Sequence, residues 1–168
     1  MFKRLYLFRH ECEMKKLIKT GIQVGRDTLL FNETQNYGGN PEMVAIGNHC
    51  VITAGVQFIT NPGILKACSN QDESCENRNS NNRIIIHDNC FIGIDAIIYP
   101  NVVIGPNAIV GAGSVVMSDV PSDMCVRGNP SRAACTVEFY ASTCKRGMMP
   151  NYVPEIKRRL LQKYFWNI

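Results

Sequence analysis

A branched aliphatic residue recurs at every sixth position through the centre of this chain, at Ile86, Ile92, Ile98, Ile104, Val110 and Val116. An amphipathic helix repeats its apolar face about every 3.6 residues and a half-buried strand every second residue, so a period of six fits strands and not helices. Each of the six units also has Asp, Asn, Gly or Pro at its third or fourth place, where these residues favour a turn. The repeat therefore predicts a series of short strands, each followed by a corner.

A chain that turns a corner every six residues returns above itself and stacks its aliphatic side chains into a continuous interior column. This is a β-solenoid, an all-β fold. A sandwich or barrel of short strands fits less well, because six consecutive units match one template. The same template occurs upstream at Ile46, Ile52 and Phe58, and more weakly at Val24 and Leu30.

The segments outside the repeat divide the chain further. Residues 61–83 interrupt the sixfold pattern, are rich in Asn and Ser, and are predicted to form one long excursion loop. The predicted solenoid covers residues 21–135. Residues 1–20 and 136–168 are predicted to form an N-terminal helical cap and a C-terminal helical tail, because such helices cover the open ends of a solenoid. Within the tail, an amphipathic helix is expected to begin at Pro154.

Composition and charge exclude several classes of protein. The chain has eight cysteines but no CxxC pair and no export signal, so we expect reduced thiols in a cytoplasmic protein. No apolar run approaches the roughly 18 residues of a membrane span, and we expect no integral membrane segment. The formal charge of +4 is concentrated at the two ends without a nucleic-acid-binding motif, and the three histidines lack the spacing of metal ligands. We therefore expect neither a nucleic-acid partner nor a metal site.

Four stretches of the sequence, "IGNHCVITAGVQFIT", "IIIHDNCFIGIDAIIYPNVVIGPNAIVGAGSVV", "CVRGNPSR" and "TVEFYASTCKRG", resemble the hexapeptide-repeat acyltransferases. The most similar branch is that of capsular and O-antigen polysaccharide O-acetyltransferases, which is related to the maltose and xenobiotic acetyltransferases. The resemblance implies a left-handed parallel β-helix of triangular section with three hexapeptides per turn, assembled as a homotrimer. In that register Cys50 and Cys90 take the same inward position on successive coils, so we expect both to be core residues.

The resemblance also implies acetyl-CoA as the cosubstrate, bound in a groove between neighbouring subunits. The residues carried over for its pantetheine arm are Gly93, Ala112, Gly113 and Ser114, and those for its nucleotide end are Asn129, Pro130 and Arg132. Gly and Ala let a ligand approach the backbone closely, and an arginine offers a phosphate a forked donor. The alternative is that the small residues only turn corners and that Arg132 is a solvated surface side chain.

The catalytic base is where this sequence departs from the family. Family members carry a histidine directly after the third strand of the coil that precedes the long loop, and this chain has Asn61 there, followed by Pro62. Asparagine does not accept a proton near neutral pH, although its amide can orient a hydroxyl. His87 is the alternative base, because its side chain is expected to protrude near a corner on the coil after the loop, and His49 is a weaker candidate.

Three explanations of this departure stay open. Another residue, such as His87, supplies the base; or the loop residues Cys68, Cys75, Asp72 or Glu73 close over the site; or catalysis is lost. The sequence reading favours an acetyl-CoA-dependent O-acetyltransferase that acts on a sugar or polysaccharide hydroxyl. The alternatives are an N-acetyltransferase acting on a nucleotide sugar and a catalytically silent hexapeptide-repeat trimer.

Overall fold

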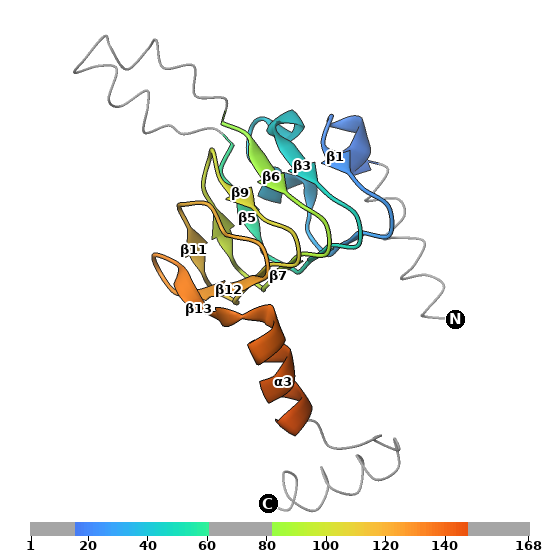
Figure 1. The fold of residues 1–168 in the computed structure, drawn as a ribbon. Coiled ribbons are helices and arrows are strands. Elements are labelled where there is room, and N and C mark those ends of the chain that lie inside the picture. Colours follow the sequence, from blue (N-terminus) through green and yellow to red (C-terminus); the bar gives the residue numbers. More distant parts are fainter. Residues whose placement is uncertain (1–15, 61–81, 148–168) are drawn as a thin grey trace, which may run out of the picture. The chain divides into compact units, whose positions relative to one another are not determined.

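Short strands wind into a parallel β-helix with three sheets (Figure 1). The computed structural model describes residues 16–60 and 82–147. Sheet A consists of β1 (Gln23–Val24), β3 (Val44–Ile46), β6 (Ile84–Ile86) and β9 (Val103–Ile104). Sheet B consists of β2 (Leu29–Leu30), β4 (Val51–Ile52), β7 (Phe91–Ile92), β10 (Ile109–Val110), β12 (Met124–Arg127) and β13 (Arg132–Thr136). Sheet C consists of β5 (Gln57–Phe58), β8 (Ile97–Ile98) and β11 (Val115–Val116).

The strand register confirms the sixfold repeat and the predicted succession of coils. The first-place residues of successive coils are partners in each sheet: Ile46, Ile86 and Ile104 in sheet A, Ile52, Ile92 and Val110 in sheet B, and Phe58, Ile98 and Val116 in sheet C. Each of them is at most 4% exposed. Burying one such side chain contributes about 1.5–3 kcal/mol to folding, so this interior column holds the coils together. The weaker template residues Val24 and Leu30 join the same column through Ile46 and Ile52.

The corners between the sheets explain the turn residues of the repeat. The fourth residue of a unit adopts the left-handed region, with φ of 55° at Asp27, 60° at Asn89, 62° at Asn101 and 58° at Asn107. Asn and Asp tolerate this conformation better than other residues with a Cβ atom, because their short polar side chains make local hydrogen bonds. Asn or Asp thus occupies most of these turn positions, and His49 takes the same conformation in the turn of residues 47–50, with a φ of 55°.

Each corner is named here by the two sheets it joins. Corner AB comprises residues 25–28, 47–50, 87–90 and 105–108. Corner BC comprises residues 53–56, 93–96 and 111–114. Corner CA comprises residues 99–102 and 117–119. These boundaries follow from the strand bounds and the register between strands.

The first coil has no third strand and closes in a different way. A short 3-10 helix, η1 (Thr34–Tyr37), brings the Tyr37 ring onto the Phe58 ring of β5, with centroids 4.8 Å apart and planes 9° from parallel. Tyr37 is fully buried, and this burial raises the pKa of its hydroxyl above the ordinary range. A second 3-10 helix, η2 (Pro41–Met43), then leads into β3. An aromatic pair therefore covers the end of the interior column next to sheet C.

The last part of the described chain leaves the repeat. Strands β12 and β13 form an antiparallel pair at the edge of sheet B, and the helix α3 (Val137–Gly147) follows directly. The chain divides into two compact units, residues 1–137 and 138–168. Residues 16–19 are helical. The rest of the predicted N-terminal cap, the predicted helix from Pro154 and most of the excursion loop lie outside the described residues.

Neither a membrane span nor a metal site occurs in the part of the chain that the structure describes. No helix among residues 16–60 and 82–147 is long and apolar enough to cross a bilayer. The same residues contain no group of three His, Cys, Asp or Glu side chains that could hold a metal ion.

Candidate functional site

Corner BC brings together the small residues that sequence analysis assigns to the coenzyme arm. The amide N–H of Gly113 donates to the Ile94 carbonyl oxygen at 2.7 Å, which ties the turn of one coil to the turn of the next. Ala112 and Gly113 are both exposed. Gly113 has a φ of +65°, and a Cβ at this position would have no atom within 4 Å. The outer surface of this turn is therefore open backbone without a large side chain.

Gly93 and Ser114 have structural tasks at the same corner. A Cβ on Gly93 would lie 2.5 Å from the Ala112 nitrogen, so only glycine allows the two coils to approach this closely. The Ser114 side chain is fully buried, and its Oγ accepts a hydrogen bond from the Gly128 N–H at 3.2 Å. These two residues support the surface that Ala112 and Gly113 present. The Cβ position of Gly93 and the side chain of Ser114 both point toward neighbouring chain segments and away from solvent.

The turn between β12 and β13 is fastened against corner BC. The Val115 N–H donates to the Gly128 carbonyl oxygen at 2.9 Å, and the Ser131 N–H donates to the Val115 carbonyl oxygen at 2.8 Å. The Asn129–Pro130 peptide bond within this turn is cis. Together with the Ser114 contact, these hydrogen bonds place the predicted nucleotide-end residues beside the predicted pantetheine residues.

The predicted nucleotide-end residues all face solvent. Asn129, Pro130 and Arg132 are exposed. One Nη atom of Arg132 donates to the Ser131 carbonyl oxygen at 3.1 Å. This hydrogen bond uses one of the five N–H donors of the guanidinium. Corner BC and this turn together form one continuous surface, named here the BC surface, made of Ala112, Gly113 and residues 128–132.

His87 lies at corner AB, at the other end of the sheet B strands from the BC surface. Its side chain is exposed, as expected from the sequence. Its backbone N–H donates to the Ile104 carbonyl oxygen at 2.9 Å, and its carbonyl oxygen accepts from the Cys50 Sγ at 3.1 Å. Within a single chain, the fold therefore separates this candidate base from the predicted coenzyme residues.

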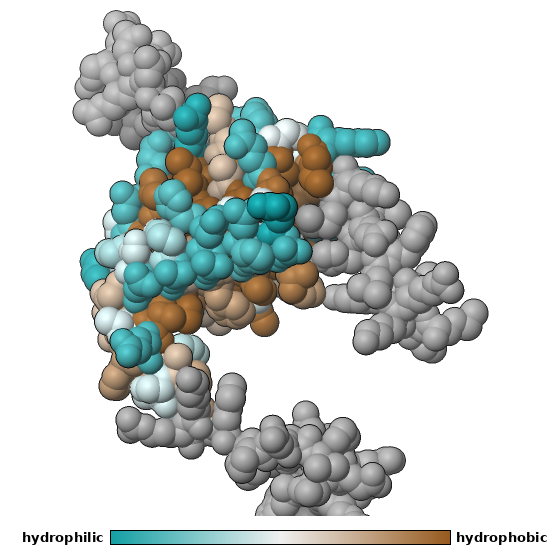
Figure 2. Space-filling model, turned by 45° about the vertical axis from the view of Figure 1, so that its right-hand side comes forward, coloured by the Kyte–Doolittle hydropathy of each residue, from teal (hydrophilic) through white to brown (hydrophobic). Residues whose placement is uncertain are grey.

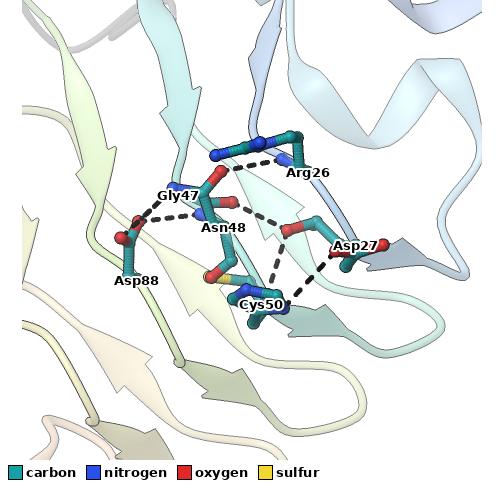
Figure 3. A network of polar contacts seen from close by, with 8 residues as sticks. Arg26, Asp27, Gly47, Asn48, Cys50 and Asp88 are labelled. Atoms are coloured by element: carbon teal, nitrogen blue, oxygen red, sulfur yellow. Dashed lines mark hydrogen bonds and ion pairs between the residues drawn. The ribbon is translucent and has the colours of Figure 1, made fainter.

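A network of polar contacts occupies corner AB (Figure 3). The Asn48 N–H donates to the Asp88 carboxylate at 2.7 Å, and the Asn48 Oδ1 accepts from the Arg26 N–H at 2.8 Å. The hydrogen bond from the Asn48 backbone holds the pKa of Asp88 below its ordinary value. His49, the weaker candidate base, lies 3.8 Å from an Asp27 carboxylate oxygen. The polar groups of this corner mainly connect one coil to the next.

Cys50 and Cys90 are core residues, as the predicted register required. They are 0% and 2% exposed, and each precedes a strand residue that pairs with the corresponding residue of the other coil. The Cys90 Sγ lies 3.1 Å from the Gly105 carbonyl oxygen. The neighbouring Cys50 thiol, together with burial, raises the pKa of the Cys90 thiol. Burial of both thiols agrees with a structural role.

Asn61, the position of the family histidine, lies outside the described residues, as do the loop alternatives Cys68, Cys75, Asp72 and Glu73. Before this gap the described chain reaches Thr60, two residues after the end of β5 in sheet C. Its Oγ1 donates to the Tyr37 carbonyl oxygen at 3.0 Å and accepts from the Asn40 N–H at 3.1 Å. Thr60 is fully buried, so the point at which the chain leaves sheet C is firmly held.

Arg127, which borders the BC surface, is not among the site residues predicted from the sequence. A Cβ on Gly111 would lie 3.0 Å from the Arg127 Cβ, and Arg127 immediately precedes the turn at Gly128. The available signal was the stretch "CVRGNPSRAAC", a Gly-Asn-Pro turn between two segments. Read as a hairpin, this stretch would have indicated that Arg127 and Arg132 face each other.

Comparison with known proteins agrees with this fold. Residues 83–117 match the family described as bacterial transferase hexapeptide (six repeats). Among solved structures, serine acetyltransferase from Neisseria gonorrhoeae is similar, with a TM-score of 0.53 and 28% identity over 69% of this chain and 39% of that one. Soybean serine acetyltransferase has a TM-score of 0.53 and 30% identity, and the match covers 68% of this chain and 40% of that one. This chain thus spans about two fifths of the length of these serine acetyltransferases.

Two further relatives match a larger share of their own length. A hexapeptide-repeat-containing acetyltransferase from Vibrio cholerae has a TM-score of 0.51 and 26% identity, over 70% of this chain and 63% of that one. The repeat and these neighbours imply that the β-helix is left-handed. The Staphylococcus aureus protein CapG is 39% identical over 137 residues, which are 81% of this chain and 78% of CapG. At this identity and coverage, the chain belongs to the hexapeptide-repeat acyltransferase family.

Proposed function

We propose that this protein is an acetyl-CoA-dependent O-acetyltransferase that acts on a sugar or polysaccharide hydroxyl. The observation that carries the proposal is the BC surface, where open backbone at Ala112 and Gly113 adjoins an exposed turn with Arg132 beside it. An extended, uncharged arm such as pantetheine fits a strip without large side chains, and a phosphate fits an arginine at the end of that strip. The relatives named above as acetyltransferases support the choice of acyl group.

In the proposed reaction, the acetyl group moves directly from the sulfur atom of CoA to the hydroxyl oxygen of the acceptor. The acceptor hydroxyl oxygen attacks the thioester carbonyl carbon, the carbon–sulfur bond breaks, and CoA leaves as its thiol after taking up a proton. A base must accept the hydroxyl proton as the new bond forms. We assign this base to His87 and a positioning role for the hydroxyl to Asn61, whose amide can donate and accept hydrogen bonds but does not take up the proton.

We further propose a homotrimer in which neighbouring copies complete each site. Within one chain, His87 and the BC surface lie at opposite ends of the sheet B strands, so a reaction that uses both needs a second copy. The outer face of sheet B supports such contacts, because Leu29 and Phe91 are 48% and 42% exposed and lie in one row across the sheet. Hydrophobic side chains reach the surface in separate patches around a hydrophilic band in Figure 2. Apolar surface of this kind favours burial against another subunit.

Release of free CoA thiol from acetyl-CoA in the presence of sugar acceptors tests the proposed activity. Turnover with hydroxyl acceptors supports O-acetylation. Turnover only with an amino group of a nucleotide sugar would replace the proposal by its enzymatic alternative. His87→Ala should abolish most turnover, whereas the matched variant His49→Ala should retain it. Absence of thiol release with every acceptor, in wild-type protein and in Asn61→His, would favour a catalytically silent trimer.

Complementation between variants tests whether two copies share a site. Ala112→Trp should block the BC surface and His87→Ala should remove the base, so each homotrimer alone is expected to be inactive. Subunits of the two variants, unfolded and refolded together, should regain activity at those interfaces where an intact BC surface meets an intact His87. Mixed trimers that stay inactive, while refolded wild-type protein is active, would contradict the shared site.

A further inference from the structure

Arg127 and Arg132 face each other across the antiparallel pair of β12 and β13. The register makes them direct partners, with a four-residue turn, Gly128–Ser131, between them. Directly opposed residues of an antiparallel pair project to the same face, with Cβ atoms about 4.5–5.5 Å apart. Like charges on directly opposed residues repel each other, and this repulsion is weak between exposed side chains.

No described carboxylate neutralises this pair. Both arginines are exposed, and neither forms an ion pair with an Asp or Glu among residues 16–60 and 82–147. The hydrogen bond of the Arg132 guanidinium is made to the neutral Ser131 carbonyl oxygen. Because a guanidinium carries five N–H donors, two neighbouring arginines retain ample capacity for a charged acceptor.

The position of the pair continues the BC surface. The Arg127 Cβ would be 3.0 Å from a Cβ on Gly111, the residue before Ala112. On the other side, Gly128 is held by the Ser114 Oγ and by the Val115 N–H. Arg127 and Arg132 thus lie on either side of the turn that ends the strip of open backbone, and the hydrogen bonds of that turn fix the positions of their backbones.

We propose that Arg127 and Arg132 form a two-arginine clamp for a phosphate group at the nucleotide end of the bound coenzyme, with Arg127 as its second, previously unassigned cation. This inference rests on the proposed acetyl-CoA site. A phosphate oxygen accepts charge-assisted hydrogen bonds that are stronger than neutral ones, and paired guanidinium groups match the doubly charged state of a phosphate monoester. Binding the anion also relieves the repulsion between the two arginines.

Calorimetric titration with CoA, dephospho-CoA and pantetheine tests the clamp. Arg127→Gln should weaken CoA binding about tenfold or more, since it removes charge-assisted hydrogen bonds to the phosphate. Pantetheine has no phosphate, so its weak binding should not change. If CoA binding falls more than dephospho-CoA binding, the clamp holds the ribose phosphate; an equal loss for both assigns it to the diphosphate. Arg127→Lys should keep part of the affinity.

A stability measurement separates this role from a merely structural one. In ligand-free protein, Arg127→Gln should unfold at the same or a higher temperature than wild type, because it removes a like-charge contact. Arg26→Gln, which changes an exposed arginine at corner AB, is the matched control and should leave CoA affinity unchanged. Unaltered CoA affinity in Arg127→Gln, with wild-type binding intact, would overturn the clamp. Absence of CoA binding in folded wild-type protein would instead overturn the proposed function and the clamp with it.

Discussion

Corners AB and BC are built from the same six-residue template, yet they differ in what they present to solvent. At corner AB, side chains such as Asn48, Asp88 and Asp27 bond or pair from coil to coil, so polar groups are used to fasten the turns together. At corner BC, Ala112 and Gly113 leave the backbone open, and the coils are fastened from below by buried Ser114. The difference is confined to the turn of residues 111–114, because Thr53 at the same corner still donates to the Ile92 carbonyl oxygen of the next coil at 2.6 Å. A candidate site thus arises where a single turn of the repeat carries only small residues.

The largest expected effect comes from filling the open corner. Ala112→Leu places a bulky side chain on the BC surface and should lower acetyl-transfer turnover by roughly 100-fold, because the thioester can no longer adopt a reactive position. Unfolding temperature should stay close to wild type, since Ala112 is exposed. Steady-state kinetics and thermal unfolding of the same preparations check both expectations. The corresponding change at corner AB, Asp88→Leu, should show the reverse pattern, with lower stability and retained coenzyme binding.

The second prediction compares two glycines of corner BC. Gly93→Ala should destabilise the protein by about 3 kcal/mol, because its Cβ would collide with backbone that cannot move freely. Gly113→Ala should cost only about 1 kcal/mol, because its surroundings are open and the loss comes from the left-handed backbone conformation. Denaturant unfolding measures the difference. Equal losses would mean that Gly93 is not a close-approach position.

A smaller effect is expected when the hydrogen bond between Ser114 and Gly128 is removed. Ser114→Ala deletes the acceptor of the Gly128 N–H and should cost about 1 kcal/mol of stability. Coenzyme affinity should also fall, because the turn that carries Asn129 and Pro130 loses one of its anchors. Ser114→Thr retains a hydroxyl and is the informative partner variant. A loss of stability in both variants without any change in affinity would show that the turn is positioned by other contacts.

The smallest effect concerns the pH dependence of corner AB. The pKa of Asp88 is held below its ordinary value of 3.8 by the hydrogen bond from the Asn48 backbone. This contribution to stability is therefore complete above that ordinary value and is lost as pH falls through the lower pKa of the folded protein. Asp88→Asn should flatten the acid limb of the stability curve below about pH 4. An unchanged acid limb in thermal unfolding scans would contradict this assignment.

The repeat and the departures from it differ in how far they could be predicted. The six-residue spacing alone predicts that Ile86, Ile92 and Ile98 are buried. The register between coils follows because the same six-residue interval recurs in every turn. The stacking of Tyr37 on Phe58 has no periodic signal, since it replaces a strand only once. Tertiary context, not local pattern, decides which residue covers the open side of the first coil.

Only part of the candidate site could be predicted from the sequence. Resemblance pointed to the residues of the BC surface, and the hydrogen bonds that bring the turn of residues 128–131 to corner BC could not be read from spacing. The register of β12 against β13 includes an irregularity between Cys125 and Val126. This irregularity lies on the far side of Val126 from the turn, so it leaves Arg127 opposite Arg132 but shifts the pairing of the residues beyond it, which spacing alone does not predict.

Hydrogen–deuterium exchange with and without CoA tests the central claim most directly, because it reports on both corners of one molecule. CoA should slow amide exchange in residues 111–115 and 128–132, where ligand contact would stabilise the BC surface against local opening. Residues 25–28 of corner AB, on the first coil, should exchange at the same rate in both states. Slower exchange at the BC surface is the result predicted here. CoA binding that leaves the exchange of the BC surface unchanged would contradict the claim that this corner is the coenzyme site.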